Sequence, residues 1–153
     1  MGVSAAAAMM LSYVESFIPS FAPGVKIGLP NIVIVYLLYK MGATKAAWVS
    51  IVRVLLTALL FGSVMSLWYS LAGAVVSLLL MTVLKKIKAF SIVGVSVVGG
   101  VAHNMAQICV AVLVTGVGAI AYYLPALIVG GIVAGVFIGL AGATVVKRVD
   151  LKI

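Results

Sequence analysis

Runs of apolar residues alternate with short polar breaks along the whole chain. The runs cover approximately residues 3–18, 31–40, 46–61, 67–84, 91–113 and 124–146. A helix needs roughly 20 mostly apolar residues to cross a bilayer, so the chain has room for about six spans. The pattern predicts an all-α fold, a polytopic bundle of six transmembrane helices that forms one integral membrane domain over residues 1–153.

The first break, residues 19–30, contains three prolines and two glycines, which exclude a continuous helix. Proline restricts the backbone and glycine permits tight turns, so this loop has few conformers. We expect it to fold over the outer mouth of the bundle and to direct Lys26 toward a binding site beneath it. Residues 62–66, in contrast, are expected to form a tight, uncharged turn.

Small residues recur at every fourth position in two parts of the chain. In the first run they are Ser4, Ala8, Ser12 and Ser16. Such a face lets another helix approach closely. Packing within this chain and docking on a partner's helix through Ser4, Ala8 and Ser12 are both open. In the last two runs the set is Ser96, Gly100, Gly131, Gly135 and Gly139, and we interpret these faces first as packing surfaces that permit close contact with another helix.

Composition makes lipid the solvent of this chain. Hydrophobic residues form 66% of the sequence and charged residues 8%, whereas a soluble domain carries roughly 25% charged residues. The formal net charge is +8, from ten Lys and Arg against two acidic residues. Because the bases form short clusters between apolar runs, they are typical of topology determinants, and we expect no nucleic-acid partner.

The bases also predict an orientation. They occur after the second and fourth runs and in the tail beyond residue 146, whereas the breaks after the third and fifth runs carry no charge. Positive charge favours the cytoplasm, so we expect both termini on the cytoplasmic side. Lys26, in the first break, is then unusual as a base on the outer side.

Arg53 lies near the middle of an apolar run. A guanidinium at membrane depth needs a partner, and it suits carboxylate or phosphate oxygens. In one interpretation Arg53, with Lys26 above it, binds the anionic group of a substrate. In the alternative it forms an ion pair with Glu15, near the outer end of the first run. Glu15 is also placed to hold Lys26 and so to fix the first loop.

A second polar group lies in the fifth run. His103 and Gln107 are four residues apart and share a helix face, with Asn104 beside them. Three such side chains at one depth suit recognition of a polar head group, and the alternative is hydrogen bonding between helices. Tyr69, near the outer end of the fourth run, is a further pocket candidate, although tyrosine is also a common interface anchor.

Residues with catalytic or metal-binding chemistry do not stand out. One His and one Cys, without a nearby pair of carboxylates, make a poor ligand set for a metal. The sequence has one Asp, so it lacks an aspartate-rich motif that would bind diphosphate through magnesium. We therefore expect no catalytic residues, no metal and no cofactor.

Three motifs resemble those of a known membrane protein family. They are ESFIP at 15–19, PGVKIGLPN at 23–31 and GGVAHNMAQ at 99–107. Over nearly its whole length the chain resembles the family named heptaprenyl diphosphate synthase component I, also called the Gx transporter family. That family is similar to the substrate-binding S-components of energy-coupling factor transporters, six-helix proteins whose outward-facing site is capped by the first loop.

The resemblance implies a multi-pass protein of the bacterial cell membrane that captures a small polar-headed or anionic substrate from the outer side. Prenyl diphosphates, a quinone precursor, a flavin and other vitamins remain open as substrates. The candidate substrate-binding residues are then Lys26, Asn31, Arg53, Tyr69, His103, Asn104 and Gln107. The resemblance also implies that the first helix docks on a transmembrane T-component with ATPase subunits. The alternative is a membrane accessory subunit of heptaprenyl diphosphate synthase in the isoprenoid pathway.

Overall fold

The computed structural model describes residues 2–18, 27–61, 64–87 and 89–149, and all regular structure in them is helical. The helices are α1 (Gly2–Ser16), α2 (Asn31–Lys40), α3 (Ala43–Phe61), α4 (Val64–Lys85), α5 (Ile92–Thr115) and α6 (Leu124–Arg148), with a 3-10 helix η1 (Gly118–Tyr123) before α6. The predicted all-α class is confirmed, and the predicted runs begin and end within a few residues of these helices.

Two helices begin earlier than predicted, α3 at Ala43 rather than near residue 46 and α4 at Val64 rather than near residue 67. Residues 64–66 were assigned to a turn, but α4 already begins at Val64. Residues 64–72 contain neither glycine nor proline, so nothing in the local sequence opposes a helix there.

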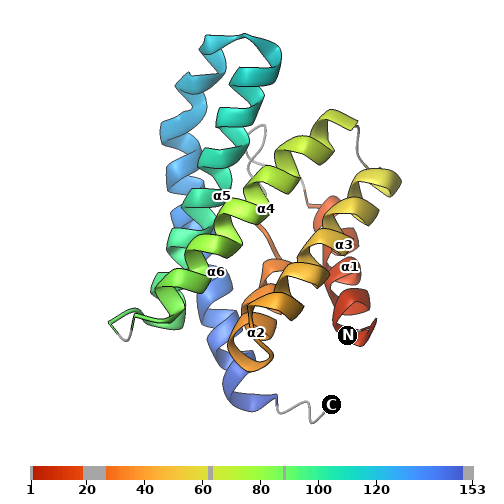
Figure 1. Cartoon of the computed structure of the whole chain (residues 1–153), viewed down its shortest axis with the longest axis vertical. Helices are drawn as coiled ribbons and strands as arrows, with labels where there is room; N and C mark the ends of the chain where they lie inside the picture. The colour runs from red at the N-terminus through yellow and green to blue at the C-terminus, as the bar shows by residue number, and fades with distance from the viewer. Residues whose placement is uncertain (1, 19–26, 62–63, 88, 150–153) are drawn as a thin grey trace.

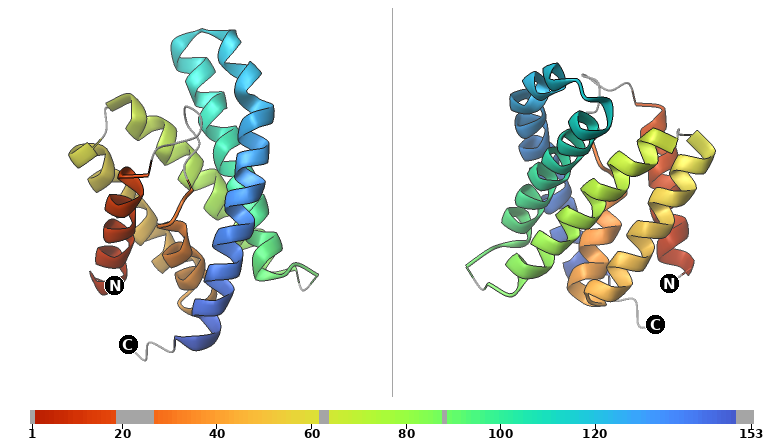
Figure 2. Two further views of the ribbon diagram at one scale, coloured as in Figure 1. Left: turned by 180° about the vertical axis from the view of Figure 1, so that it is seen from behind. Right: turned by 45° about the horizontal axis from the view of Figure 1, so that its top comes forward.

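The helices alternate in direction, so that α1 begins and α6 ends at the same end of the molecule (Figures 1 and 2). The ends of the helices that carry basic residues gather there as well. These residues are Lys40, Lys45, Lys85, Lys86, Lys147 and Arg148. Because α1 begins at this end, Glu15, the second-last residue of α1, lies away from it.

Four segments are long and apolar enough to cross a membrane. They are Ala43–Leu60, Val64–Lys85, Ile92–Thr115 and Gly118–Arg148. The other two helices are shorter, with 15 residues in α1 and 10 in α2, against the roughly 20 that a full span needs. The structure therefore describes a membrane-embedded helical protein with four candidate spans, and the expectation of six complete spans remains a prediction.

The last residues of the first loop, 27–30, lie within the bundle. Pro30 is among the most buried side chains, and residues 27–29 are half-buried. Gly28 has φ +79°, a conformation that suits glycine, and a Cβ there would lie 3.0 Å from Ile138 of α6. Residues 27–30 are thus closely packed, and α2 starts inside the molecule. The predicted cover over the outer mouth rests on residues 19–26, which lie outside the described residues, and stays a prediction.

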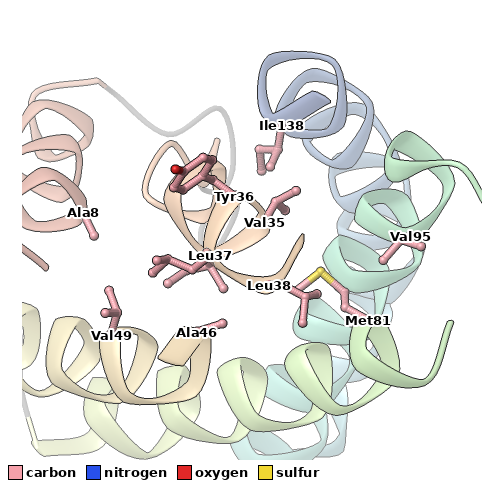
Figure 3. Packing of buried hydrophobic residues seen from close by; sticks show 11 residues of the cluster. Ala8, Val35, Tyr36, Leu37, Leu38, Ala46, Val49, Met81, Val95 and Ile138 are labelled. Carbon is pink, nitrogen blue, oxygen red and sulfur yellow. The ribbon is translucent and has the colours of Figure 1, made fainter. Parts of the chain in front are cut away.

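The short helix α2 forms the centre of the core. Its residues 34–38 are all buried, and apolar side chains from α1, α3, α4, α5 and α6 surround them (Figure 3). Lys85 of α4 closes the end of α2, because its Nζ donates a hydrogen bond of 2.6 Å to the Leu38 carbonyl and lies 5.2 Å from the Tyr39 ring centre. A central helix held at both ends gives the other helices a fixed surface to pack on.

Glycines bring α5 and α6 close together, so the small-residue faces are packing surfaces as expected, and the structure shows that they pack on each other. A Cβ added at Gly135 would lie 2.5 Å from the Cα of Val97, and one at Gly139 would lie 2.6 Å from the Cα of Val93. At Gly131 the added Cβ would lie 3.0 Å from the backbone of Gly100. Since these neighbours are backbone atoms, only glycine allows the two helices to approach this far.

The small-residue face of α1 packs inside the chain. Ser4, Ala8 and Ser12 are buried, whereas Ser16 is exposed. Ala8 points toward Val49 of α3 (Figure 3), and Thr57 of α3 contacts Met9. The structure therefore agrees with the first alternative, in which Ser4, Ala8 and Ser12 pack against helices of this chain. Docking on a partner through the same residues would require α1 to move away and stays a prediction.

Candidate functional site

Arg53 projects from the inward face of α3. Ala46 and Val49 on this face are buried in the core, and Arg53 follows Val49 by four residues, so the two share one side of the helix. The Nε atom of Arg53 is shielded and has no hydrogen-bond partner within the part of the chain that the structure describes. A buried donor left without a partner costs about 1–3 kcal/mol. Arg53 therefore retains capacity to donate to an added group.

Glu15 links Arg53 to the first loop. Its carboxylate interacts electrostatically with the Arg53 guanidinium, and its Oε1 accepts a hydrogen bond from the backbone N–H of Gly28. The sequence predicts Arg53 or Lys26 as the partner of Glu15. Lys26 lies outside the described residues, and the loop partner in the structure is the backbone N–H of Gly28, which the sequence did not indicate. The sequence feature that could have suggested this contact is a glycine in a proline-rich loop that follows a helix with a single acidic residue.

Asn31 opens α2 next to this pair. Its Nδ2 would lie 3.1 Å from a Cβ built on Gly28, so the side chain folds back over the loop. The backbone N–H groups of Asn31, Ile32 and Val33 donate to the carbonyls of Gly28, Leu29 and Pro30. Those N–H groups are therefore not available to an anion, although the end of a helix often is. Any polar contact from this position would come from the Asn31 amide.

His103 and Gln107 lie against Gly73 of α4. A Cβ added at Gly73 would lie 2.9 Å from Cε1 and Nδ1 of His103 and 3.0 Å from Cγ of Gln107. Both side chains therefore point toward α4, and glycine makes the room that they occupy. The sequence did not indicate that Gly73 makes this space, because a single glycine in an apolar helix is not distinctive. Tyr69 precedes Gly73 by one turn on the same face of α4 and is partly buried.

Asn104 faces a different neighbour. Its Nδ2 donates a hydrogen bond of 2.7 Å to the Leu127 carbonyl of α6. The expectation that His103, Asn104 and Gln107 meet one ligand stays a prediction, but Asn104 already has a partner on another helix. The reason is geometric, since adjacent residues on a helix point about 100° apart, so Asn104 turns to α6 while the other two turn to α4. Its amide nitrogen serves the alternative role of a bond between helices.

We predict that Asn104→Ala lowers stability without removing ligand binding. Hydrogen bonds between membrane helices contribute on average about 0.6 kcal/mol and at most about 1.7 kcal/mol. Thermal unfolding in detergent should therefore show a small fall in Tm. Met105→Ala, at the exposed neighbouring residue, is the matched control and should change Tm less. An unchanged Tm combined with lost binding would instead assign Asn104 to the ligand.

The candidates thus form two groups on different helices. Glu15, Asn31 and Arg53 come from α1, α2 and α3, whereas Tyr69, His103 and Gln107 come from α4 and α5. Within the described residues, no cluster of three His, Cys, Asp or Glu side chains could hold a metal ion. The arrangement offers amide, imidazole, phenol and guanidinium groups, which suit binding of a polar or anionic group rather than a metal.

Two surface grooves occur elsewhere. One of about 310 Å³ lies between α1 and α3 and is lined by Met9, Met10, Tyr13, Val14 and Leu60. The other, of about 390 Å³, lies between α3 and α4 and includes Ala47, Ser50 and Ala74. Neither groove is lined by any of the predicted substrate-binding residues.

The fold and these residues define a class, a helical membrane protein with polar and charged side chains between its helices. More particularly, the family described as heptaprenyl diphosphate synthase component I matches residues 5–145, and the chain belongs to this family. The resemblance seen in the three motifs is thereby confirmed. Neither the curated proteins nor the solved structures give a significant match to this chain.

Proposed function

We propose that this protein is a membrane substrate-binding protein for uptake, which captures a small molecule with a polar or anionic head group from the outer side. The observation that carries the proposal is the shielded Nε of Arg53, which lacks a partner among the described residues. Polar groups at membrane depth are costly and usually mark a ligand site or pathway. Arg53 also lies in an electrostatic interaction with Glu15, which holds the end of the first loop.

In this proposal the two groups of side chains have different roles. Arg53 receives the anionic part of the substrate, because a guanidinium matches carboxylate and phosphate oxygens. His103 and Gln107 bond to the rest of the polar head, with Tyr69 one turn away. A substrate anion competes with Glu15 for Arg53, so its arrival weakens the hold of Glu15 on the loop end.

A substitution that displaces His103 and Gln107, while both side chains are kept, tests the proposal. Gly73→Ala would displace His103 and Gln107, which lie within 3.0 Å of the added Cβ. Since each hydrogen bond contributes about 0.5–1.5 kcal/mol, we expect affinity to fall roughly 2–10-fold per displaced bond. The readout is the ligand that gently purified protein retains in native mass spectrometry. The control is Gly118→Ala, where an added Cβ meets nothing within 4 Å.

The description of the family favours a second candidate, an accessory subunit of a prenyl diphosphate synthase. The two functions predict different partners. The uptake function predicts copurification with a transmembrane component and ATPase subunits. The accessory function predicts copurification with a soluble catalytic chain and a changed product length. A pull-down from native membranes distinguishes them, and a catalytic prenyl synthase as the sole partner would contradict uptake.

A further inference from the structure

The groove between α3 and α4 is open to the surface that these helices present to lipid. Both helices are candidate spans, and Val75 and Leu79 at the groove are exposed. Its volume of about 390 Å³ lies within the range of roughly 300–1,000 Å³ that ligand pockets occupy. Small residues, Ala47 on α3 and Ala74 on α4, create the hollow. Any occupant of this groove is therefore apolar over most of its length.

The groove extends over only part of the membrane. On α3 it runs from Ala43 to Ile51, a distance of about 12 Å at 1.5 Å per residue. The hydrocarbon core is about 30 Å thick, so one leaflet is about 15 Å. A helix of a partner protein would need a contact along most of the core. A groove confined to one leaflet matches the acyl chain of a lipid better.

One end of the groove is polar and basic. Thr44 and Thr82 line it near the start of α3 and the end of α4. The exposed Lys45 follows Thr44 directly, and the exposed Lys86 lies four residues beyond Thr82, just past the end of α4. Trp48, one turn along α3 from Thr44, is 61% exposed and is typical of the interface between hydrocarbon and head groups. Glu15, the acid among the described residues, interacts with Arg53, eight residues along α3 from Lys45, so no described carboxylate competes for these lysines.

We propose that this groove is a binding site for an anionic phospholipid. One acyl chain lies between α3 and α4 against Ala47 and Ala74, and the phosphate contacts Lys45 and Lys86, with the Thr44 hydroxyl as a donor. Lys85 is not assigned to the head group, because its Nζ is already bonded to the Leu38 carbonyl. This site shares no residue with the proposed substrate site, so each proposal can fail without the other.

Native mass spectrometry from mixed micelles tests the site, with phosphatidylglycerol and phosphatidylcholine as the probes. The wild-type protein should retain phosphatidylglycerol preferentially. Each basic side chain near an anionic surface contributes enough attraction for about a five-fold change in binding. Lys45→Gln and Lys86→Gln should therefore each lower phosphatidylglycerol retention about five-fold and leave phosphatidylcholine unchanged. Both lysines are on the surface, so these variants keep the fold.

A second set of variants tests whether the lipid chain lies in the groove, because a larger side chain would fill it. Ala47→Leu should reduce retention of both lipids, while Ala126→Leu, at an exposed position on α6, should not. Lys147→Gln removes a base from the same end of the molecule but from α6, and should leave the preference intact. Equal losses in Lys45→Gln and Lys147→Gln would mean attraction by net charge alone and would overturn the site. Lipid retention unchanged in Ala47→Leu, or a copurified protein lost in that variant, would also overturn it.

Discussion

Arg53→Ala is expected to remove most ligand binding while the protein still reaches the membrane in normal amounts. The guanidinium is the strongest available partner for a substrate anion, and its Nε has no partner among the described residues. Truncating one member of a buried charged pair costs about 2–5 kcal/mol, which corresponds to roughly 30-fold to a few thousand-fold in affinity. The measurement is the ligand retained in native mass spectrometry, with expression followed in parallel.

A double substitution separates ligand binding from structure. Glu15 interacts electrostatically with Arg53, so the single change also leaves that carboxylate without its cation. Arg53→Met combined with Glu15→Gln removes both charges and should restore any lost stability, because a neutral pair has no unpaired charge. If Arg53 binds the ligand, binding stays lost in the double variant. Binding that survives would assign Arg53 to a structural role.

Gly135→Leu should separate α5 from α6 and unfold the bundle at a lower temperature. An added Cβ at this position lies 2.5 Å from the Cα of Val97 and 2.9 Å from the Ser96 carbonyl oxygen, and backbone atoms cannot give way as a flexible side chain does. Overpacking of this kind typically costs about 1–3 kcal/mol, occasionally more. Thermal unfolding followed by circular dichroism in detergent measures the change.

Gly118→Leu is the control for the glycine substitution. The same side chain is added at a position where a Cβ meets nothing within 4 Å, so we expect little change in Tm. Because α5 carries His103 and Gln107, Gly135→Leu should also lower ligand retention. If Gly135→Leu had the same Tm as Gly118→Leu, α5 and α6 would pack less closely than these distances require.

The sequence by itself determined the α-helices and some of their packing surfaces. Apolar runs ended by proline, glycine or lysine predicted all six α-helices of the described chain to within a few residues of their ends. The spacing of Gly131, Gly135 and Gly139 predicted a face for close helix contact, and the structure shows that α5 is the helix it meets. These features are local, since helix period, backbone freedom and side-chain size act over a few residues. The family also followed from local motifs, which the match over residues 5–145 confirms.

Only the tertiary structure decided which faces of the helices point inward. In a soluble helix an apolar stripe marks the buried side, but lipid is as apolar as the core, so these helices are apolar all round. The sequence therefore could not show that Asn104 turns to α6 while His103 and Gln107 turn to α4. Nor could it show that the last residues of the first loop lie within the bundle and place Gly28 against Glu15. Those contacts join residues far apart in the chain, and they depend on helix rotation and loop path, which local patterns do not encode.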